Sequence, residues 1–185
     1  MICYKRIHTN GSAIKVKENI ITREDGSKII EELYKKWDGE YIMRCNYSSK
    51  DPSYAPFQRY NLCGILGWLD VLEPSSSNVN LRKEIIDDYH KTILPHMERV
   101  AQDYVDEKLH YWIENKEYNI GKVKEDWASM LEEEYDVRIL KRCLESNDSA
   151  TYDTLNENGV DMDFEFKTMV FKECAKREKE LKEMI

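Results

Sequence analysis

From residue 57 onward, apolar side chains recur at the three- and four-residue spacing of an α-helix, and this pattern constrains the fold more than any other feature. The longest such stretch is residues 80–117. Its apolar stripe consists of Ile85, Ile86, Tyr89, Ile93, Met97, Val100, Tyr104 and Val105. Because such a stripe has to pack against other elements, the pattern predicts a mostly helical chain.

Five helices are expected beyond residue 57. They cover 62–72, 80–117, 121–134, 136–146 and 167–185. Pro95 either kinks one long helix or opens a new helix at its first turn. Residues 160–167 fit an alternating strand or an acidic helix start.

The N-terminal part has a different pattern. Residues 2–8 and 13–19 flank Asn10-Gly11, a dipeptide typical of a two-residue hairpin turn. Residues 41–47 alternate as a third strand, and residues 27–38 show helical spacing. The prediction is therefore a predominantly helical α+β fold: an N-terminal β-hairpin plus a third strand with one helix, followed by a bundle of about five helices.

A loop rich in turn-forming residues divides these two patterns. Residues 48–56 contain two prolines and several serines. We therefore expect a small β-rich N-terminal region at 1–56 and a helical region at 57–185, packed together as a single domain.

Composition narrows the class of protein. No apolar run reaches the length of a membrane span, and no apolar segment of a signal peptide follows the first basic residues. The five cysteines are scattered, odd in number and without a C-x-x-C pair. We expect a cytoplasmic protein in a reducing compartment, without a membrane partner.

The net charge of −8 is concentrated in the middle of the chain. Residues 61–165 hold twenty-four acidic and eleven basic side chains, whereas residues 1–60 hold eight acidic and eleven basic ones. A surface of this charge repels nucleic acid, so no direct nucleic-acid binding is expected through it.

Residues 154–165 partly match a calcium-binding EF-hand loop. Asn156, Asn158, Gly159 and Glu165 occupy its third, fifth, sixth and twelfth positions. However, the first position is Thr154 instead of an acidic ligand, and the chain has no second loop of this kind. We expect a turn here and no specific calcium site.

Histidine and carboxylate pairs at helical spacing are the candidate metal ligands. They are Asp87 with His90 and Glu107 with His110. A di-iron bundle would need such pairs to project into its core. The helical geometry of 95–117 places Glu107 and His110 opposite the apolar stripe, so no metal site is expected.

Catalytic motifs with known mechanics are absent from the sequence. It has no phosphate-binding loop, no dinucleotide fingerprint, no G-x-S-x-G and no H-E-x-x-H. No cofactor is expected, and the chain is predicted not to be an enzyme. No residues support a resemblance to a particular family.

An acidic stripe opposite the apolar face is the strongest candidate site. Its residues on the helix of 95–117 fall within about 100° of arc and span about 21 Å. The candidate partner-binding residues, including those of the following segment, are Asp103, Asp106, Glu107, Glu114, Glu117, Glu125, Asp126, Glu132, Glu133, Glu134 and Asp136. A charge run of this kind is either a solvated surface or an imitation of nucleic-acid phosphates.

The leading hypothesis is a non-enzymatic inhibitor that docks this stripe on a basic protein that handles nucleic acid. Anti-CRISPR and anti-restriction proteins of phages and mobile elements are the corresponding class, by analogy alone. The alternatives are a metal-dependent enzyme that uses His90, His96 and His110 with nearby carboxylates, and an oligomeric structural subunit.

Overall fold

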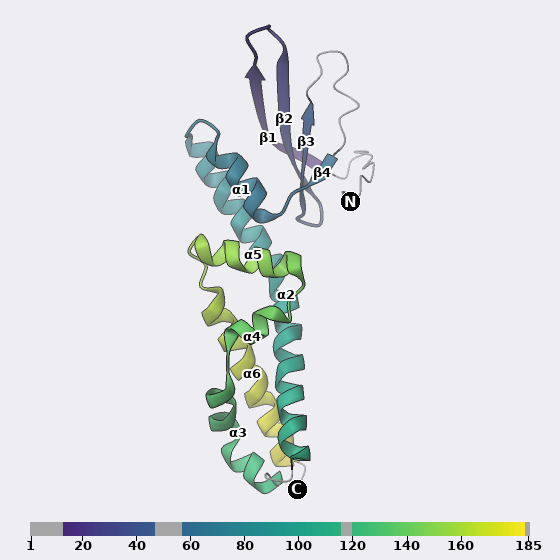
Figure 1. The fold of residues 1–185 in the computed structure, drawn as a ribbon, viewed down its shortest axis with the longest axis vertical. Helices are drawn as coiled ribbons and strands as arrows, with labels where there is room; N and C mark the ends of the chain where they lie inside the picture. The colour runs from purple at the N-terminus through teal and green to yellow at the C-terminus, as the bar shows by residue number, and fades with distance from the viewer. Residues whose placement is uncertain (1–12, 47–56, 116–119, 184–185) are drawn as a thin grey trace. The chain divides into compact units, whose positions relative to one another are not determined.

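The computed structural model describes residues 13–46, 57–115 and 120–183 (Figure 1). The elements in chain order are β1 (Ala13–Thr22), β2 (Lys28–Lys36), β3 (Tyr41–Asn46), β4 (Phe57–Arg59), α1 (Leu62–Asp70), α2 (Ser76–Glu114), α3 (Ile120–Glu134), α4 (Val137–Arg142), α5 (Ser146–Glu157) and α6 (Met162–Glu183). The predicted α+β, mostly helical fold is confirmed.

The chain divides into two compact units, 1–89 and 90–185. The division falls inside α2, whose first part belongs to the first unit and whose second part belongs to the second. The domain boundary near residue 56 stays a prediction.

The first unit contains a four-stranded antiparallel sheet in the order β1-β2-β3-β4 (Figure 1). Gly26 and Gly39 have positive φ in the two tight turns that connect β1 to β2 and β2 to β3. The predicted third strand is confirmed as β3. The predicted strand at 13–19 is part of β1, whereas the strand at 2–8 and the turn at Asn10-Gly11 lie outside the described residues, as does the predicted loop at 48–56.

The prediction of a helix at 27–38 is wrong, because this segment forms the strand β2, which pairs with β1 on one side and β3 on the other. Its apolar residues also fit helical spacing, and both faces of the strand carry charges. Glu31 and Lys35 lie on one face, and Glu32 lies on the other. Each of these charges has a specific partner in the fold. Because charged residues occur on both faces, the sequence of the strand lacks the alternation of apolar and polar residues by which strands are predicted.

One face of the sheet is covered by α1 and the beginning of α2. The Trp68 indole of α1 donates a hydrogen bond of 2.9 Å to Glu31 of β2. Asp88 of α2 accepts a 2.7 Å hydrogen bond from the Tyr41 hydroxyl and lies 2.6 Å from the Lys35 ammonium. The buried apolar side chains of this unit include Leu33, Met43, Leu62, Ile65, Leu66, Leu69, Leu81 and Ile85.

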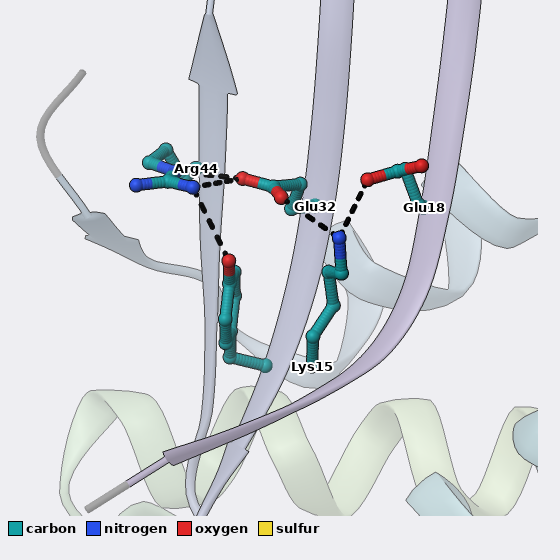
Figure 2. A network of polar contacts seen from close by, with 5 residues as sticks. Lys15, Glu18, Glu32 and Arg44 are labelled. Carbon is teal, nitrogen blue, oxygen red and sulfur yellow. Dashed lines mark hydrogen bonds and ion pairs between the residues drawn. The ribbon is translucent and has the colours of Figure 1, made fainter. Parts of the chain in front are cut away.

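The opposite face of the sheet carries a charged network around Glu32, which is only 7% exposed (Figure 2). Arg44 of β3 donates to the Glu32 carboxylate through both Nε and a terminal nitrogen, and Lys15 of β1 lies 3.2 Å away on the other side. Arg44 also donates to the Tyr34 hydroxyl, and Lys15 pairs with Glu18. Glu32 therefore connects three neighbouring strands.

Every element that the structure describes in the second unit is a helix, and several boundaries differ from those predicted. Pro95 lies inside the continuous helix α2, so the alternative of a new helix at this proline is wrong. Pro95 is exposed, which leaves the carbonyl of Lys91 accessible to water in place of its missing amide partner. The helix expected at 136–146 ends at Arg142, and α5 was not predicted.

The core of this unit is built around aromatic side chains. Trp112 of α2 and Trp127 of α3 meet edge to face, with ring centroids 5.3 Å apart. The Trp127 indole donates to the backbone carbonyl of Cys174 in α6, and burial raises the pKa of the Cys174 thiol to about 12. Tyr152 of α5 packs against Phe166 of α6. These contacts hold four helices together.

None of the helices in the described residues has the length and apolar character needed to cross a membrane.

We predict that Glu32→Gln lowers the free energy of unfolding by about 1–2 kcal/mol at neutral pH, because charge-assisted hydrogen bonds are lost. Burial disfavours the charged form of Glu32, but the hydrogen bonds from Arg44 and Lys15 outweigh it and lower the pKa of this carboxyl. Its contribution to stability should therefore be complete above the ordinary glutamate pKa of about 4.3 and disappear as the pH falls through the lowered value.

Urea unfolding across this pH range tests the prediction. Glu18→Gln is the matched control, because Glu18 is exposed and touches the same network only through Lys15. It should change stability little. An equal destabilisation by the two variants, or a Glu32→Gln effect that persists undiminished in acid, would contradict the assigned role of Glu32.

Candidate functional site

The candidate site lies along the seam between α2 and α3 in the second unit. Glu134, at the end of α3, pairs with Lys108 of α2 and accepts a 3.2 Å hydrogen bond from the Trp112 indole. Its backbone carbonyl accepts a 3.1 Å hydrogen bond from the Tyr104 hydroxyl. Because Trp127, earlier in α3, lies against Trp112, the two helices run antiparallel.

Helix α6 covers one side of this seam. Arg177 of α6 lies 2.8 Å from Asp106 of α2, and Phe171 of α6 packs against Tyr135, which directly follows α3. The approach of α6 from this side leaves the opposite side of the seam uncovered by it. Successive residues of a helix are rotated by about 100°. Glu107 and Glu114 of α2 therefore lie on this opposite side, and so does the flank of α3 that points away from α6.

We define the acidic face as Asp103, Glu107 and Glu114 of α2 together with Asp126 and Glu133 of α3. All five side chains are exposed. Its length along α2 is about 16 Å at 1.5 Å per residue. Glu114 lies 3.3 Å from His110, whereas the other four carboxylates form no ion pair with a residue that the structure describes.

Two further predicted residues, Glu125 and Glu132, are exposed on α3 but point away from the seam. They too have no ion pair within the described ranges. Glu117 lies outside those ranges.

Three of the predicted partner-binding carboxylates have contacts within the unit. Asp106 is paired with Arg177, and Glu134 connects α3 to α2. Asp136 caps the N-terminus of α4 by accepting a 2.9 Å hydrogen bond from the Arg138 amide. The side chain and amide of Arg138 lower the pKa of Asp136. Only the Asp136 cap has a signal in the sequence, because the other partners are distant along the chain.

A shallow pocket of about 290 Å³ adjoins the acidic face between α2 and α4. Asp103 and Glu107 line it together with the basic side chains of Arg99 and Lys108 and the apolar side chains of Val100 and Ile139. Next to the acidic face, Tyr111 is 57% exposed. The pocket could not be predicted from the sequence, because it depends on how α4 packs.

The candidate metal-binding histidines do not converge. Nε2 of His90 lies 2.7 Å from Glu165, Nδ1 of His96 lies 2.5 Å from Asp148, and His110 is next to Glu114. Asp87 is exposed. Across the described ranges, no group of three or more His, Cys, Asp or Glu side chains is arranged to hold a metal ion.

The segment that resembles an EF-hand loop is a turn between two helices. Residues 154–157 end α5, Gly159 has a φ of +85°, and α6 begins at Met162, so the alternative of a strand at 160–167 is wrong. Asn156 accepts a 2.9 Å hydrogen bond from the Met162 amide and donates one of 3.2 Å to Asp163. Its side chain therefore closes the turn instead of facing an ion.

We predict that calcium does not bind this turn specifically, because its first and last residues are helical and Asn156 is already bonded. The measurement is a calcium titration followed through the amide resonances of residues 154–165. Saturation at micromolar calcium would contradict the prediction.

We also predict that Glu134→Ala lowers the free energy of unfolding by about 1–2 kcal/mol, because the buried Trp112 indole loses its acceptor. Glu133→Ala, the neighbouring control, should leave stability unchanged or slightly increase it, since it removes an unpaired like charge. Urea unfolding of both variants provides the test, and equal effects would contradict the distinction drawn here between a structural and a free carboxylate.

In comparisons with protein-family models, curated proteins and solved structures, nothing matches this chain. Any functional proposal therefore depends on its own residues and contacts.

Proposed function

We propose that this chain is a non-enzymatic interaction protein that docks the acidic face on a basic surface of a partner that handles nucleic acid. One observation carries the proposal: Asp103, Glu107, Asp126 and Glu133 are exposed together and have no ion-pair partner among the described residues. Two cations beside the seam are committed within the unit, since Lys108 pairs with Glu134 and Arg177 pairs with Asp106.

The energetics of such a face favour docking over folding as its role. Exposed like charges repel and destabilise a helix by a few tenths of a kcal/mol per pair. Arg99 and Lys108 line the pocket beside Asp103 and Glu107, but none of the four carboxylates forms an ion pair with a described cation that would relieve this repulsion. A lysine- or arginine-rich surface would relieve it and would increase the rate of encounter through long-range attraction.

The surroundings of the carboxylates support a specific contact in addition to attraction. The pocket beside Asp103 and Glu107 combines these carboxylates with the apolar side chains of Val100 and Ile139, and Arg99 and Lys108 also line it. A long basic side chain has the same combination, an aliphatic stem and a charged end. The exposed Tyr111 offers an aromatic contact of the kind that is enriched at the centres of interfaces.

The nature of the partner follows from the same chemistry. A groove that binds phosphates through lysine and arginine side chains also attracts a row of carboxylates, so the chain would compete with nucleic acid for that groove. Inhibition of a defence nuclease, as by anti-CRISPR or anti-restriction proteins, is one form of such competition. It stays a prediction based on charge and analogy.

The test is a face variant that combines Asp103→Asn, Glu107→Gln, Asp126→Asn and Glu133→Gln. The probe is a fluorescent lysine- and arginine-rich peptide, measured by anisotropy at low salt and with duplex DNA as competitor. We expect the wild-type chain to bind the peptide and not to bind the DNA. The variant should bind the peptide at least tenfold more weakly, which corresponds to about 1.4 kcal/mol. Thermal stability should not decrease, since the removed charges are unpaired.

A matched control removes the same number of charges elsewhere. It combines Glu24→Gln, Glu73→Gln, Asp87→Asn and Glu157→Gln, all exposed carboxylates without an ion pair to a described residue. The control should bind the peptide within about twofold of the wild-type chain, with the same steep salt dependence. Equal losses in the two variants would mean that net charge alone attracts the peptide, and the proposed face would be wrong.

A further inference from the structure

A groove of about 520 Å³ runs between α2 and α6 of the second unit. Its lining is mainly apolar and includes Leu94, Met169 and Phe164. Phe164, on the first turn of α6, is 66% exposed. A solvent-exposed phenylalanine beside an apolar groove is a typical feature of a contact surface.

The two sides of the groove carry opposite free charges. Glu98 lies on the α2 side and Lys172 on the α6 side, and neither has an ion-pair partner in the described part of the chain. The other charged side chains of the lining are engaged within the unit. Glu165 contacts His90, and Glu173 contacts Lys176 and Arg177.

We propose that this groove is the surface through which two copies of the chain associate. In a symmetric pair, both copies present the same patch, so the patch has to complement itself. A twofold axis through the middle of the groove sets α2 of one copy against α6 of the other. Glu98 then faces Lys172 of the second copy, and Lys172 faces Glu98, while the apolar side chains between them are covered.

The charge balance of the groove supports a second copy as the occupant. Two chains of net charge −8 repel each other, so a contact between them is least unfavourable through a region that is nearly neutral. The groove meets this requirement, because its basic and acidic side chains almost balance. A strongly basic partner would meet Lys172 and Lys176 here, and a strongly acidic one would meet Glu98, Glu165 and Glu173.

The groove is also separate from the acidic face. On α2, Leu94 and Glu98 of the groove lie on the side opposite Asp103 and Glu107 of the acidic face, by the 100° rotation per residue. Association through the groove thus brings together the near-neutral surfaces and leaves the unpaired carboxylates apart.

The first test is the mass of the full-length chain by sedimentation equilibrium over a hundredfold range of concentration. We expect a reversible monomer–dimer equilibrium that Phe164→Asp shifts to the monomer by at least tenfold in dissociation constant. The backbone amide of Phe164 bonds Asp161 at the start of α6, where an acidic side chain is favourable, so this variant should fold. A circular dichroism melt checks that it does.

The second test exchanges charges between the two sides of the groove. Glu98→Lys alone and Lys172→Glu alone should each weaken self-association, because every pair across the interface then joins like charges. Mixing the two variants should restore dimers, and these should be heterodimers, since opposite charges then meet at both pairs. One of the two variants is uniformly labelled with ¹⁵N, so that mass spectrometry under native conditions distinguishes the three species.

A control removes another exposed aromatic side chain. Trp37, at the turn between β2 and β3, is 84% exposed, and Trp37→Ala should leave the monomer–dimer equilibrium unchanged. A wild-type chain that stays monomeric throughout would overturn the proposal. Dimers that persist in folded Phe164→Asp, or no preference for heterodimers in the mixture, would also overturn it.

Discussion

The second unit depends on the contact that Glu134 makes across the seam of α2 and α3. One carboxylate neutralises Lys108 and accepts from the buried indole of Trp112, and the backbone carbonyl of the same residue accepts from Tyr104. These contacts fix α3 antiparallel to α2 with Trp127 against Trp112. The flank that carries Asp126 and Glu133 is thereby brought beside the exposed side of α2, and the acidic face exists only because of this register.

The helices other than α5 were predictable because their apolar spacing is determined locally, whereas β2 was not. A strand inside a sheet is stabilised by its neighbouring strands, and the charged side chains of β2 find their partners only when the sheet is formed. Glu32 is buried because Lys15 and Arg44 arrive from β1 and β3, and Glu31 is fixed by Trp68 of α1. Taken alone, the same residues satisfy helical spacing equally well. Tertiary pairing decided between the two.

The acidic stripe shows the same limit at the level of single residues. Helical geometry predicted that the carboxylates of α2 face away from the core, and Asp103 and Glu107 are exposed as expected. It could not predict that Asp106 would meet Arg177, more than seventy residues later, or that Glu134 would be structural. Sequence identifies which side chains leave the core, but their partners come from the packing of α3 and α6.

The two proposed surfaces of the second unit have different electrostatic requirements, and α2 separates them. A face of unpaired carboxylates favours a basic partner and opposes a second copy of the same chain, because the copies repel. A near-neutral apolar groove gains from excluding water and has little long-range attraction for any charged partner. Each surface therefore selects against the occupant of the other. A pair joined through the groove would keep both acidic faces exposed, so self-association and docking would not compete. It would also present two faces at once, and a partner with two basic sites at a matching distance would bind the pair more tightly than it binds one chain.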